Sequence, residues 1–277
     1  MKAKIFLKIK KAARKSSILV SANEKRKDFR DFIGDLLGII FCKLARNIKL
    51  RQEWQPLVSV LLTSYNRPQM IRRAIQSVLG QTYSNFELII LDDNSNEETR
   101  TVIESYLQKD LRIRRYYSEV KDEDRWKEAR YAALFNIGLA MARGELIAYL
   151  TDDDGYLLSK LEKMVKFFRE HPAVKIAYNQ QNYLPQNKTR RAYGVLKKPG
   201  HVVDAISAMH YKSCVEELGN WETGKGKEDA DRYIVGADDM FFNKLARKYA
   251  FYPVREVLDT RINHKDTISA KMAEKGK

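Results

Sequence analysis

The chain has 277 residues, 44% of them hydrophobic, which is enough for one large α/β domain or two small ones with a buried core. Its two cysteines, Cys42 and Cys214, lie far apart and match no metal-ligand spacing, so we expect reduced thiols in a reducing compartment rather than a disulfide framework or a zinc site. The net charge of +15 is uneven, because residues 1–55 hold 15 Lys or Arg against 5 Asp or Glu and so carry +10 of it.

This N-terminal segment combines its basic charge with apolar residues. Ile5, Phe6, Leu7 and Ile9 stand among lysines, and a second apolar group follows in residues 32–40. The pattern is typical of amphipathic helices that lie on anionic membrane surfaces, so we predict a basic helical extension in peripheral contact with a membrane. The alternative is a solvated arm with a helix that packs on the main domain. No aromatic stacking array accompanies the charge, so nucleic acid is not an expected partner.

A membrane-spanning segment is not expected. No uninterrupted apolar run approaches the roughly 20 residues that cross a bilayer, and the longest near-miss, residues 32–44, is broken by Asp35 and Lys43. Lysines also interrupt the N-terminal apolar stretch, which argues against a cleavable signal peptide. We therefore predict a cytoplasmic protein, peripheral on the inner face of the membrane at most.

After Pro56 the pattern alternates between strands and helices, as in a parallel sheet with crossover helices. Pro68 opens the first of these helices. In chain order, the sequence predicts a strand at 57–63, a helix at 68–79, a strand at 86–91, a helix at 97–108, a strand at 112–117, a helix at 130–142, a strand at 146–150, a helix at 160–169 and a strand at 174–178.

From about residue 183 the periodicity weakens. Helices are predicted at 211–218 and 239–248, and residues 224–231 are predicted to form a mobile loop. We expect residues 1–55 to form the basic extension and residues 56–277 one catalytic domain. Within that domain, residues 56–155 are expected to bind a nucleotide and residues 156–277 an acceptor.

Three consecutive carboxylates follow the strand at 146–150. Asp152, Asp153 and Asp154 repel one another unless a cation lies among them, and hard divalent cations prefer carboxylate oxygens. This stretch predicts a Mg²⁺ or Mn²⁺ site. The alternative is a solvated acidic turn, since Asp and Gly are common turn residues.

Polar residues also follow two earlier strands. In an open α/β sheet, ligands bind beyond the carboxyl ends of the strands. Tyr65 follows the first strand and Asp93 the second. Together with the later acids these residues could hold a nucleotide: Tyr65 stacks on the base, Asp93 accepts hydrogen bonds from base or ribose, and the acids hold a metal that binds the diphosphate.

The order of these motifs resembles the family 2 glycosyltransferases, which have the GT-A fold. The matching motifs are TSYN at 63–66, LDDNS at 91–95 and RGELIAYLTDDD at 143–154. Residues 85–99 and 129–136 make the chain most similar to the family members that build spore-coat polysaccharide in bacilli. The resemblance covers residues 56–268. It implies an α/β domain with a mostly parallel central sheet and flanking helices, and it says nothing about residues 1–55.

The resemblance also implies roles for individual residues. It assigns five positions to the nucleotide: Thr63, Tyr65, Asp93, Arg125 and Asp152. Asp153 ranks first as metal ligand, with Asp154 and His264 as further candidates. The family's usual acidic pattern is Asp-x-Asp-Asp, and Thr151 stands where its first acid often lies, which leaves open the carboxylate that touches the cation.

A second acidic segment, VGADDMFF at 235–242, falls where this family keeps its catalytic base. The resemblance assigns that role to Asp238, with Asp239 as the alternative. A carboxylate near a helix N-terminus stays ionised and can take a proton from an attacking acceptor hydroxyl. Asp204 and His210 match positions near the sugar and the acceptor.

These residues together predict an inverting, metal-dependent glycosyltransferase. It would move a sugar from a nucleoside diphosphate, most simply UDP or dTDP, to a polysaccharide or lipid-linked acceptor in cell-surface or spore-coat polysaccharide synthesis. The metal acts as Lewis acid and template, and the displacement is direct.

Two other functions fit parts of the sequence. Residues 152–157 resemble the Asp-x-Asp-Gly motif of haloacid-dehalogenase-like phosphatases, with Asp152 as nucleophile and residues 236–239 as distal metal acids. That motif normally opens its domain, whereas three strand-helix units precede it here. The other alternative is an inactive scaffold that binds membrane or polymer. The basic arm favours it, as does Thr151 in the place of the first acid.

Overall fold

The structure is a computed structural model that describes residues 33, 36–38, 40, 41, 43, 53–184, 188–190, 194–199, 203–224 and 230–262, the side chains of 230–235 excepted. The chain divides into two compact units, Met1–Glu53 and Trp54–Lys277. In the first unit the described residues are helical, and Leu37, Ile40 and Phe41 have exposed side chains. Among the helices of the described residues, none has the length and apolarity that crossing a bilayer requires.

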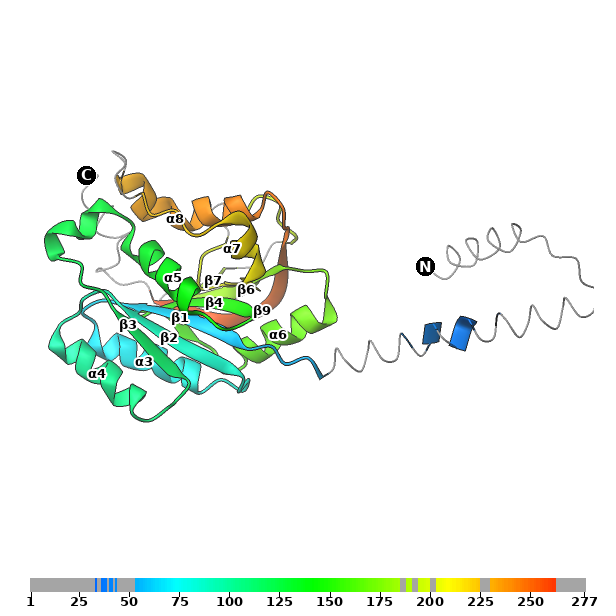
Figure 1. Cartoon of the computed structure of the whole chain (residues 1–277), viewed down its shortest axis with the longest axis horizontal. Coiled ribbons are helices and arrows are strands. Elements are labelled where there is room, and N and C mark those ends of the chain that lie inside the picture. Colours follow the sequence, from blue (N-terminus) through cyan, green and yellow to red (C-terminus); the bar gives the residue numbers. More distant parts are fainter. Residues whose placement is uncertain are drawn as a thin grey trace, which may run out of the picture. The chain divides into compact units, whose positions relative to one another are not determined.

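The second unit is built on a sheet with strand order β3-β2-β1-β4-β8-β6-β9-β5, and β7 pairs with β6 (Figure 1). Four strands run parallel: β1 (Val58–Ser64), β2 (Phe86–Asp92), β3 (Ile113–Tyr117) and β4 (Leu146–Thr151). In register, Thr63 lies beside both Leu91 and Thr151. The residues that follow β1, β2 and β4 therefore emerge at one edge of the sheet.

The other strands make the sheet mixed. They are β5 (Gly155–Tyr156), β6 (Ile176–Leu184), β7 (Lys188–Arg190), β8 (Ala208–Tyr211) and β9 (Phe251–Ile262). β8 runs antiparallel to both β4 and β6, whereas β9 runs parallel to β6. The parallel arrangement predicted for the first four strands is confirmed, and the later strands add antiparallel pairs.

Helices cover both faces of the sheet (Figure 1). One face carries α3 (Pro68–Leu79), α4 (Glu97–Leu107) and α6 (Lys160–Glu170), and the other carries α5 (Arg130–Met141), α7 (Ser213–Leu218) and α8 (Ala230–Leu245). A short 3₁₀ helix, η1 (Asp122–Lys127), precedes α5. Two layers of helix around one sheet explain why the central strands are apolar on both faces.

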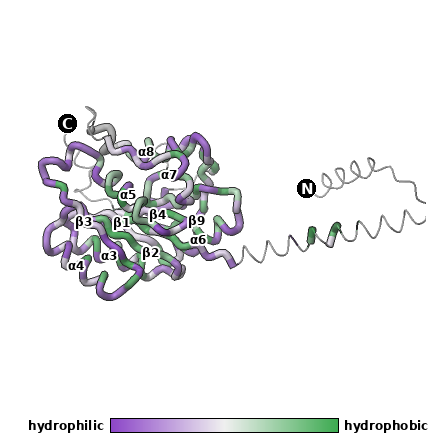
Figure 2. The backbone as a smooth tube through the Cα atoms, viewed as in Figure 1, coloured by the Kyte–Doolittle hydropathy of each residue, from purple (hydrophilic) through white to green (hydrophobic). Residues whose placement is uncertain are grey.

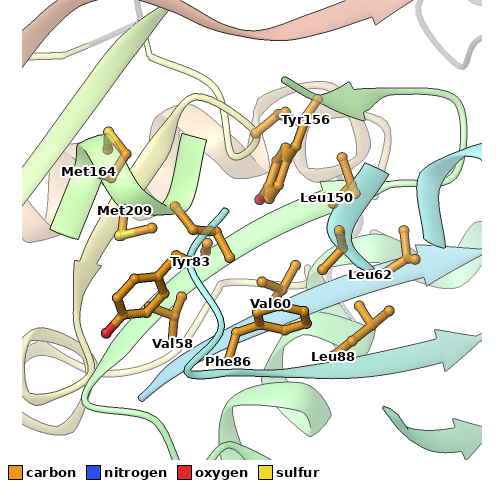
Figure 3. Packing of buried hydrophobic residues seen from close by; sticks show 14 of the residues in the cluster. Val58, Val60, Leu62, Tyr83, Phe86, Leu88, Leu150, Tyr156, Met164 and Met209 are labelled. Carbon is orange, nitrogen blue, oxygen red and sulfur yellow. The ribbon is translucent and has the colours of Figure 1, made fainter. Parts of the chain in front are cut away.

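Successive side chains along each strand point to opposite faces of the sheet, so the hydrophobic core has two parts, one on each face. Val58, Val60 and Leu62 of β1 pack on the α3 side, where Figure 3 shows them with residues of neighbouring elements, while Leu61 packs on the α5 side. Figure 2 shows the hydrophobic residues concentrated in these strands and the hydrophilic ones on the outer helix surfaces. Cys214 lies in the second cluster as a buried free thiol, and Cys42 is outside the described residues.

The elements predicted between residues 57 and 178 are confirmed with boundaries shifted by at most two residues, except that β6 continues to Leu184. The strand β8 includes Tyr211, which was predicted as the first residue of a helix, and α7 begins two residues later at Ser213. The strand β9 was not predicted. Pro253 lies within it and cannot donate a ladder hydrogen bond, and its pairing with β6 shifts register after Asn179, which together hide the strand pattern.

The helix predicted at 239–248 is wrong at its start. α8 begins at Ala230, so Asp238 lies in the interior of the helix and not at its N-terminus. The argument from the helix dipole therefore does not apply to Asp238. The fully buried Phe241, Phe242 and Leu245 anchor this helix, while the charged residues before it masked its beginning in the sequence. Of the loop predicted at 224–231, residues 225–229 lie outside the described residues.

Candidate active site

Residues from three strand ends meet at one edge of the sheet. Asp93 donates its backbone N–H to the carbonyl of Ser64, and the backbone N–H of Tyr65 donates to Asp152 Oδ2 at 3.0 Å. Thr63, predicted to contact the nucleotide, is buried at the end of β1. The loops after β1, β2 and β4 are thus cross-linked to one another.

Two asparagines give these loops their shape. Asn66 and Asn94 have positive φ angles of 53° and 61°, a left-handed conformation that Asn tolerates better than most residues. Asn66 Oδ1 accepts a hydrogen bond from the backbone N–H of Asn96 at 2.7 Å, and Arg100 donates to Asn94 Oδ1 at 2.7 Å. The loops enclose a polar hollow of about 280 Å³, lined by Tyr65, Asn66, Asn94, Ser95, Asn96 and Asp122.

Asp93 is held by two arginines beside this hollow. Its Oδ1 accepts from Arg130 Nη2 at 2.7 Å and its Oδ2 from Arg125 Nη1 at 2.5 Å. The Arg125 guanidinium also lies over the Tyr65 ring, 3.7 Å from its centroid. An aromatic face, a carboxylate and guanidinium donors therefore lie together, which is the set that recognises a planar heterocycle. Arg130 was missed in the sequence, although it lies only five residues after Arg125.

A third arginine bridges two of the three late acids. Arg67 Nη1 contacts Asp152 Oδ1 and Asp153 Oδ2, both at 3.0 Å. Burial raises the pKa of Asp152 to about 6, and the charge of Arg67 opposes that rise. Arg67 follows the TSYN motif directly but was not assigned a role from the sequence. A cation already bridges two of the carboxylates predicted to hold a metal.

Asp154 does not face the same way as its neighbours. Its Oδ2 accepts from Thr151 Oγ1 at 2.8 Å and its Oδ1 from the backbone N–H of Ile262 at 3.0 Å, so it fastens the end of β9. Each of its carboxylate oxygens accepts a hydrogen bond within the protein, as both oxygens of Asp152 do, so the role of Asp154 as a metal ligand stays a prediction. His264, another predicted ligand, lies outside the described residues.

The remaining acids fit a divalent cation only in part. Within the described ranges, no group of three or more His, Cys, Asp or Glu side chains is arranged to hold a metal. Mg²⁺ commonly binds through one or two carboxylates and takes its other ligands from phosphate oxygens and water. Asp153, which is more accessible than Asp152 or Asp154, and Asp152 match that arrangement if a diphosphate completes the coordination.

Asp238 lies apart from these paired acids. Its Oδ1 is a buried atom without a hydrogen-bond partner, and its Oδ2 receives only a long contact of 3.5 Å from the backbone N–H of Ala205 in the described part of the chain. Burial, then the charge of Asp204, raise its pKa to about 7, while Arg261 acts against them. A poorly solvated carboxylate with a pKa near neutrality is suited to accept a proton.

Asp204 is saturated by its neighbours. Its Oδ1 accepts from Gln181 Nε2 at 2.9 Å and from the backbone N–H of Ser207 at 3.0 Å. Its Oδ2 meets Arg261 Nη1 at 3.0 Å and Arg190 Nη1 at 3.5 Å. The predicted contact of Asp204 with sugar or acceptor is therefore not favoured, because its lone pairs already serve the protein.

His210 lies in the hydrophobic core instead of at a substrate surface. Trp221 Nε1 donates to the Tyr149 hydroxyl at 3.3 Å, and that hydroxyl lies 2.8 Å from His210 Nε2. His210 Nδ1 is 2.8 Å from the carbonyl of Tyr211. A neutral ring protonated at Nδ1 satisfies both contacts, and burial lowers the pKa of His210 to about 4. With no exposed surface, His210 has no direct access to sugar or acceptor.

Comparison with known proteins decides the family. The sequence profile of glycosyl transferase family 2 matches residues 59–251. This chain belongs to glycosyl transferase family 2. Protein CgeD of Bacillus subtilis is 38% identical over 76% of this chain and 51% of its own length. The putative teichuronic acid biosynthesis glycosyltransferase TuaG of the same species is 37% identical over 42% of this chain and 44% of its own length. The chain thus spans about half the length of these relatives.

Solved structures show the fold of this family 2 domain. TarS of S. aureus has a TM-score of 0.60 at 15% identity, covering 76% of this chain and 37% of TarS. The mannosyltransferase PcManGT of Pyrobaculum calidifontis, in complex with GDP-Man and Mn²⁺, has a TM-score of 0.57 at 15% identity, covering 79% of this chain and 60% of PcManGT. The predicted GT-A fold is confirmed.

The structure of this family 2 chain brings the residues predicted from the sequence together in two places. At the sheet edge it gathers the five residues predicted for the nucleotide, together with Asp153. On the acceptor side, Asp238 and Asp239 are neighbours on α8 and Asp204 lies near them. Three arginines were missed, Arg67, Arg130 and Arg261, and Arg261 could not be found because its strand β9 was not predicted.

Proposed function

We propose that the chain is an inverting glycosyltransferase that moves a sugar from a nucleoside diphosphate to an acceptor hydroxyl. The proposal rests on a chain of contacts that connects the acids after β4 with Asp238. Asp154, next to Asp153, binds the end of β9 at Ile262. The preceding residue, Arg261, pairs with Asp204, whose neighbour Ala205 donates to Asp238. One network of contacts therefore holds both the charged site proposed for the donor and the carboxylate of Asp238.

The donor base is placed against Tyr65 and Asp93, where the Arg125 guanidinium, which lies over the Tyr65 ring and is hydrogen-bonded to Asp93, has to move aside. Uracil and thymine present a ring N–H that Asp93 can accept and flanking carbonyls to which Arg125 can donate. Cytosine presents an acceptor nitrogen at the same ring position, which would face the carboxylate unfavourably. UDP or dTDP is therefore the proposed carrier. TarS has been solved in complex with UDP-GlcNAc and with UDP, which supports a nucleotide-sugar donor for this fold.

Divalent metal is the proposed cofactor, as Mg²⁺ or Mn²⁺. Asp153 and Asp152 are the residues that would hold it, and PcManGT, solved with Mn²⁺ and GDP-Man, supports metal use in this fold. When bound, such an ion stabilises negative charge on a departing diphosphate. Arg67 contributes positive charge at the same place from the protein itself.

Asp238 is the proposed general base. The acceptor oxygen attacks the anomeric carbon as its proton passes to Asp238, and the bond between that carbon and the diphosphate oxygen breaks. One displacement inverts the anomeric configuration and needs no covalent glycosyl-enzyme. Because the pKa of Asp238 is raised to about 7, its ionised form is present in a useful fraction at neutral pH and still takes up a proton readily.

The acceptor is proposed to be a saccharide or lipid-linked saccharide of the cell envelope or spore coat. The name of TuaG, a putative teichuronic acid biosynthesis glycosyltransferase, supports an envelope polysaccharide. We also propose that residues 1–55, with a net charge of +10, bring the chain to the anionic cytoplasmic face of a membrane. The exposed side chains of Leu37, Ile40 and Phe41 fit an interfacial helix.

Membrane contact is tested by sedimentation of the full chain with vesicles. Vesicles with anionic phosphatidylglycerol should bind the chain at low salt and release it at high salt, while phosphatidylcholine vesicles should bind it weakly. Equal binding to both vesicle types would contradict the electrostatic proposal.

Donor binding is tested by thermal shift with UDP, dTDP, GDP, CDP and ADP, each with Mn²⁺ and with EDTA. A ligand that binds only the folded state raises the melting temperature. We expect UDP or dTDP with Mn²⁺ to stabilise the wild type and to stabilise Asp93→Asn much less. If no diphosphate stabilises the chain, the inactive scaffold becomes the better interpretation.

The phosphatase alternative is not supported. Asp152, its required nucleophile, is occupied by Arg67 and by the backbone N–H of Tyr65. The chain also belongs to a glycosyl transferase family over residues 59–251.

A further inference from the structure

The carboxylate of Asp238 is surrounded by groups from several elements. Asp204 approaches from the loop before β8 and Arg261 from β9, while Asp239 lies next to it on α8. Burial, and to a smaller extent the charge of Asp238, raise the pKa values of Tyr131 on α5 and Tyr149 on β4, and both are neutral at ordinary pH. Among these described neighbours, the charged groups are thus two acids and one guanidinium.

The loop that carries Asp204 is held firmly. Besides its two arginines, Asp204 accepts from Gln181 on β6 and from the backbone of Ser207. The fully buried Lys160 donates to the carbonyl of Ile206 at 2.7 Å. Ala205, in the same loop, provides the backbone N–H that faces Asp238. The position of Asp204 and its loop is therefore determined by contacts from four separate elements, β6, β7, β9 and α6.

We propose that Asp204 and Arg261 are a pair of positioning residues with opposed charges that together control how readily Asp238 accepts a proton. This inference rests on the proposed role of Asp238 as base, and it gives Asp204 a function other than substrate contact. Neither residue needs to touch the acceptor. The pair acts through its charge and by holding the backbone of Ala205 against Asp238.

The two members of the pair act in opposite directions. The negative charge of Asp204 disfavours the ionised form of Asp238 and raises its pKa, whereas the positive charge of Arg261 favours that form and lowers it. Removing Asp204 should therefore lower the pKa of Asp238, and the freed guanidinium of Arg261 would lower it further. Removing Arg261 should raise it, because Asp204 then loses its closest counter-charge.

Profiles of kcat/KM against pH test this directly in the full chain with Mn²⁺ and its best donor. In the wild type, activity should fall below about pH 7, where Asp238 becomes protonated. Asp204→Asn should move this acidic limb down by about one pH unit and Arg261→Gln should move it up by a similar amount. A purely structural role would lower activity without opposite movements, so unmoved limbs or shifts in one direction would overturn the proposal.

Two further variants keep the test decisive. Arg261→Lys retains a positive charge and should keep the limb closer to the wild-type position than Arg261→Gln does. Arg190→Gln is the matched control, because Arg190 approaches the same carboxylate at the longer distance of 3.5 Å and should move the limb less. If Asp204→Asn fails to fold, the comparison of the two Arg261 variants still decides the question, and equal limbs in both would overturn the proposal.

A measurement without substrate separates this inference from the proposed function. The carboxyl ¹³C signal of Asp238, assigned by its loss in Asp238→Asn, can be titrated by NMR in wild type and variants. Opposite shifts in Asp204→Asn and Arg261→Gln would support the pair even in a chain that transfers no sugar. Transfer activity together with an unchanged titration of Asp238 would overturn the pair and leave the proposed function standing.

Discussion

The acids proposed to bind the donor and the acid proposed as general base differ in the groups that contact them. On the nucleotide side, Asp93 is held by Arg125 and Arg130, and Arg67 bridges Asp152 and Asp153. On the acceptor side, Asp238 has no cation in hydrogen-bond contact among the described residues, and its Oδ1 is buried without a partner. Pairing orients a carboxylate and opposes the effect of burial on its pKa. Burial still raises the pKa of Asp152 to about 6 against the charge of Arg67, and it raises the pKa of Asp238 to about 7.

The largest expected effect comes from removing the unpaired acid. Asp238→Asn retains the shape of the side chain but cannot take up the acceptor proton, so we expect kcat to fall about 10³-fold. Binding of UDP or dTDP should change less than about twofold, because the variant leaves the arginine-paired acids intact. Transfer kinetics and titration calorimetry check the two parts. Comparable loss of nucleotide binding would break the distinction between the two sides.

The paired acid on the nucleotide side should show the reverse pattern. Asp93→Asn removes the carboxylate that two mostly buried guanidinium groups share and leaves them, among the described residues, only the carboxylates of Asp122 and Glu128, which we expect to destabilise the chain by about 3 kcal/mol and to weaken nucleotide binding about tenfold or more. Urea unfolding and calorimetry with UDP measure these effects. Glu123→Gln on the exposed surface of η1 is a control that should alter neither. Unchanged nucleotide affinity in Asp93→Asn would remove Asp93 from the donor site.

His210 resembles Asp238 in being a buried titratable group that, within the described residues, has no charged side chain in contact. Its pKa in the folded state is about 4, below the usual 6.5, so the unfolded chain binds the extra proton between these values. Stability from the neutral ring is therefore present above pH 6.5 and lost as pH falls towards 4. Between pH 7 and pH 5 we expect His210 to account for about 2 kcal/mol of lost stability.

His210→Gln tests this window, because Gln can replace the hydrogen bond with Tyr149 but does not titrate. The difference in unfolding free energy between pH 7 and pH 5 should be about 2 kcal/mol smaller in the variant than in the wild type. The exposed His171 provides the control, and His171→Gln should keep the wild-type difference. An unchanged difference in His210→Gln would show that the ring is not held neutral by burial.

The smallest expected effect concerns Arg67, which bridges the two acids proposed to hold the metal. Arg67→Gln should raise the affinity for Mn²⁺ about tenfold, because it removes a competing cation from Asp152 and Asp153. UDP binding in EDTA should become weaker, because positive charge near the diphosphate is lost. Electron paramagnetic resonance of free Mn²⁺ measures the first effect and thermal shift the second. A lower Mn²⁺ affinity in the variant would contradict competition between Arg67 and the metal.

Residues 56–155, which we propose bind the nucleotide, could be predicted well because each of their sequence patterns lies within a short stretch of the chain. The strands β1, β2 and β4 are apolar runs that end at polar residues, and parallel strands place those ends at one edge of the sheet. The order of these runs along the chain is therefore enough to group Tyr65, Asp93 and Asp152. The arginines that hold these acids were mostly missed, because a basic residue has no pattern of its own to show which carboxylate it meets.

The acceptor half could be predicted only in part. The residues 238 and 239 were found through their motif, but the start of α8 and the whole of β9 were not, since Pro253 and the register shift opposite Asn179 obscure the strand. Asp154, Asp204 and His210 are chemically able to bind a cation, an acceptor or a sugar. Their actual partners lie on segments far away in the sequence, as for Asp154 and Ile262.

The family, the alternation of strands and helices in residues 57–178 and the acids at the strand ends follow from the sequence alone. These depend on periodicity and on the order of motifs along the chain. Tertiary structure was needed to show which acids are paired with arginines, which accept hydrogen bonds from the protein's own backbone, and that Asp238 has no paired cation within the described residues. The charge state of a buried carboxylate depends on the groups packed around it, and for Asp238 those groups come from the loop before β8, from β9 and from α8.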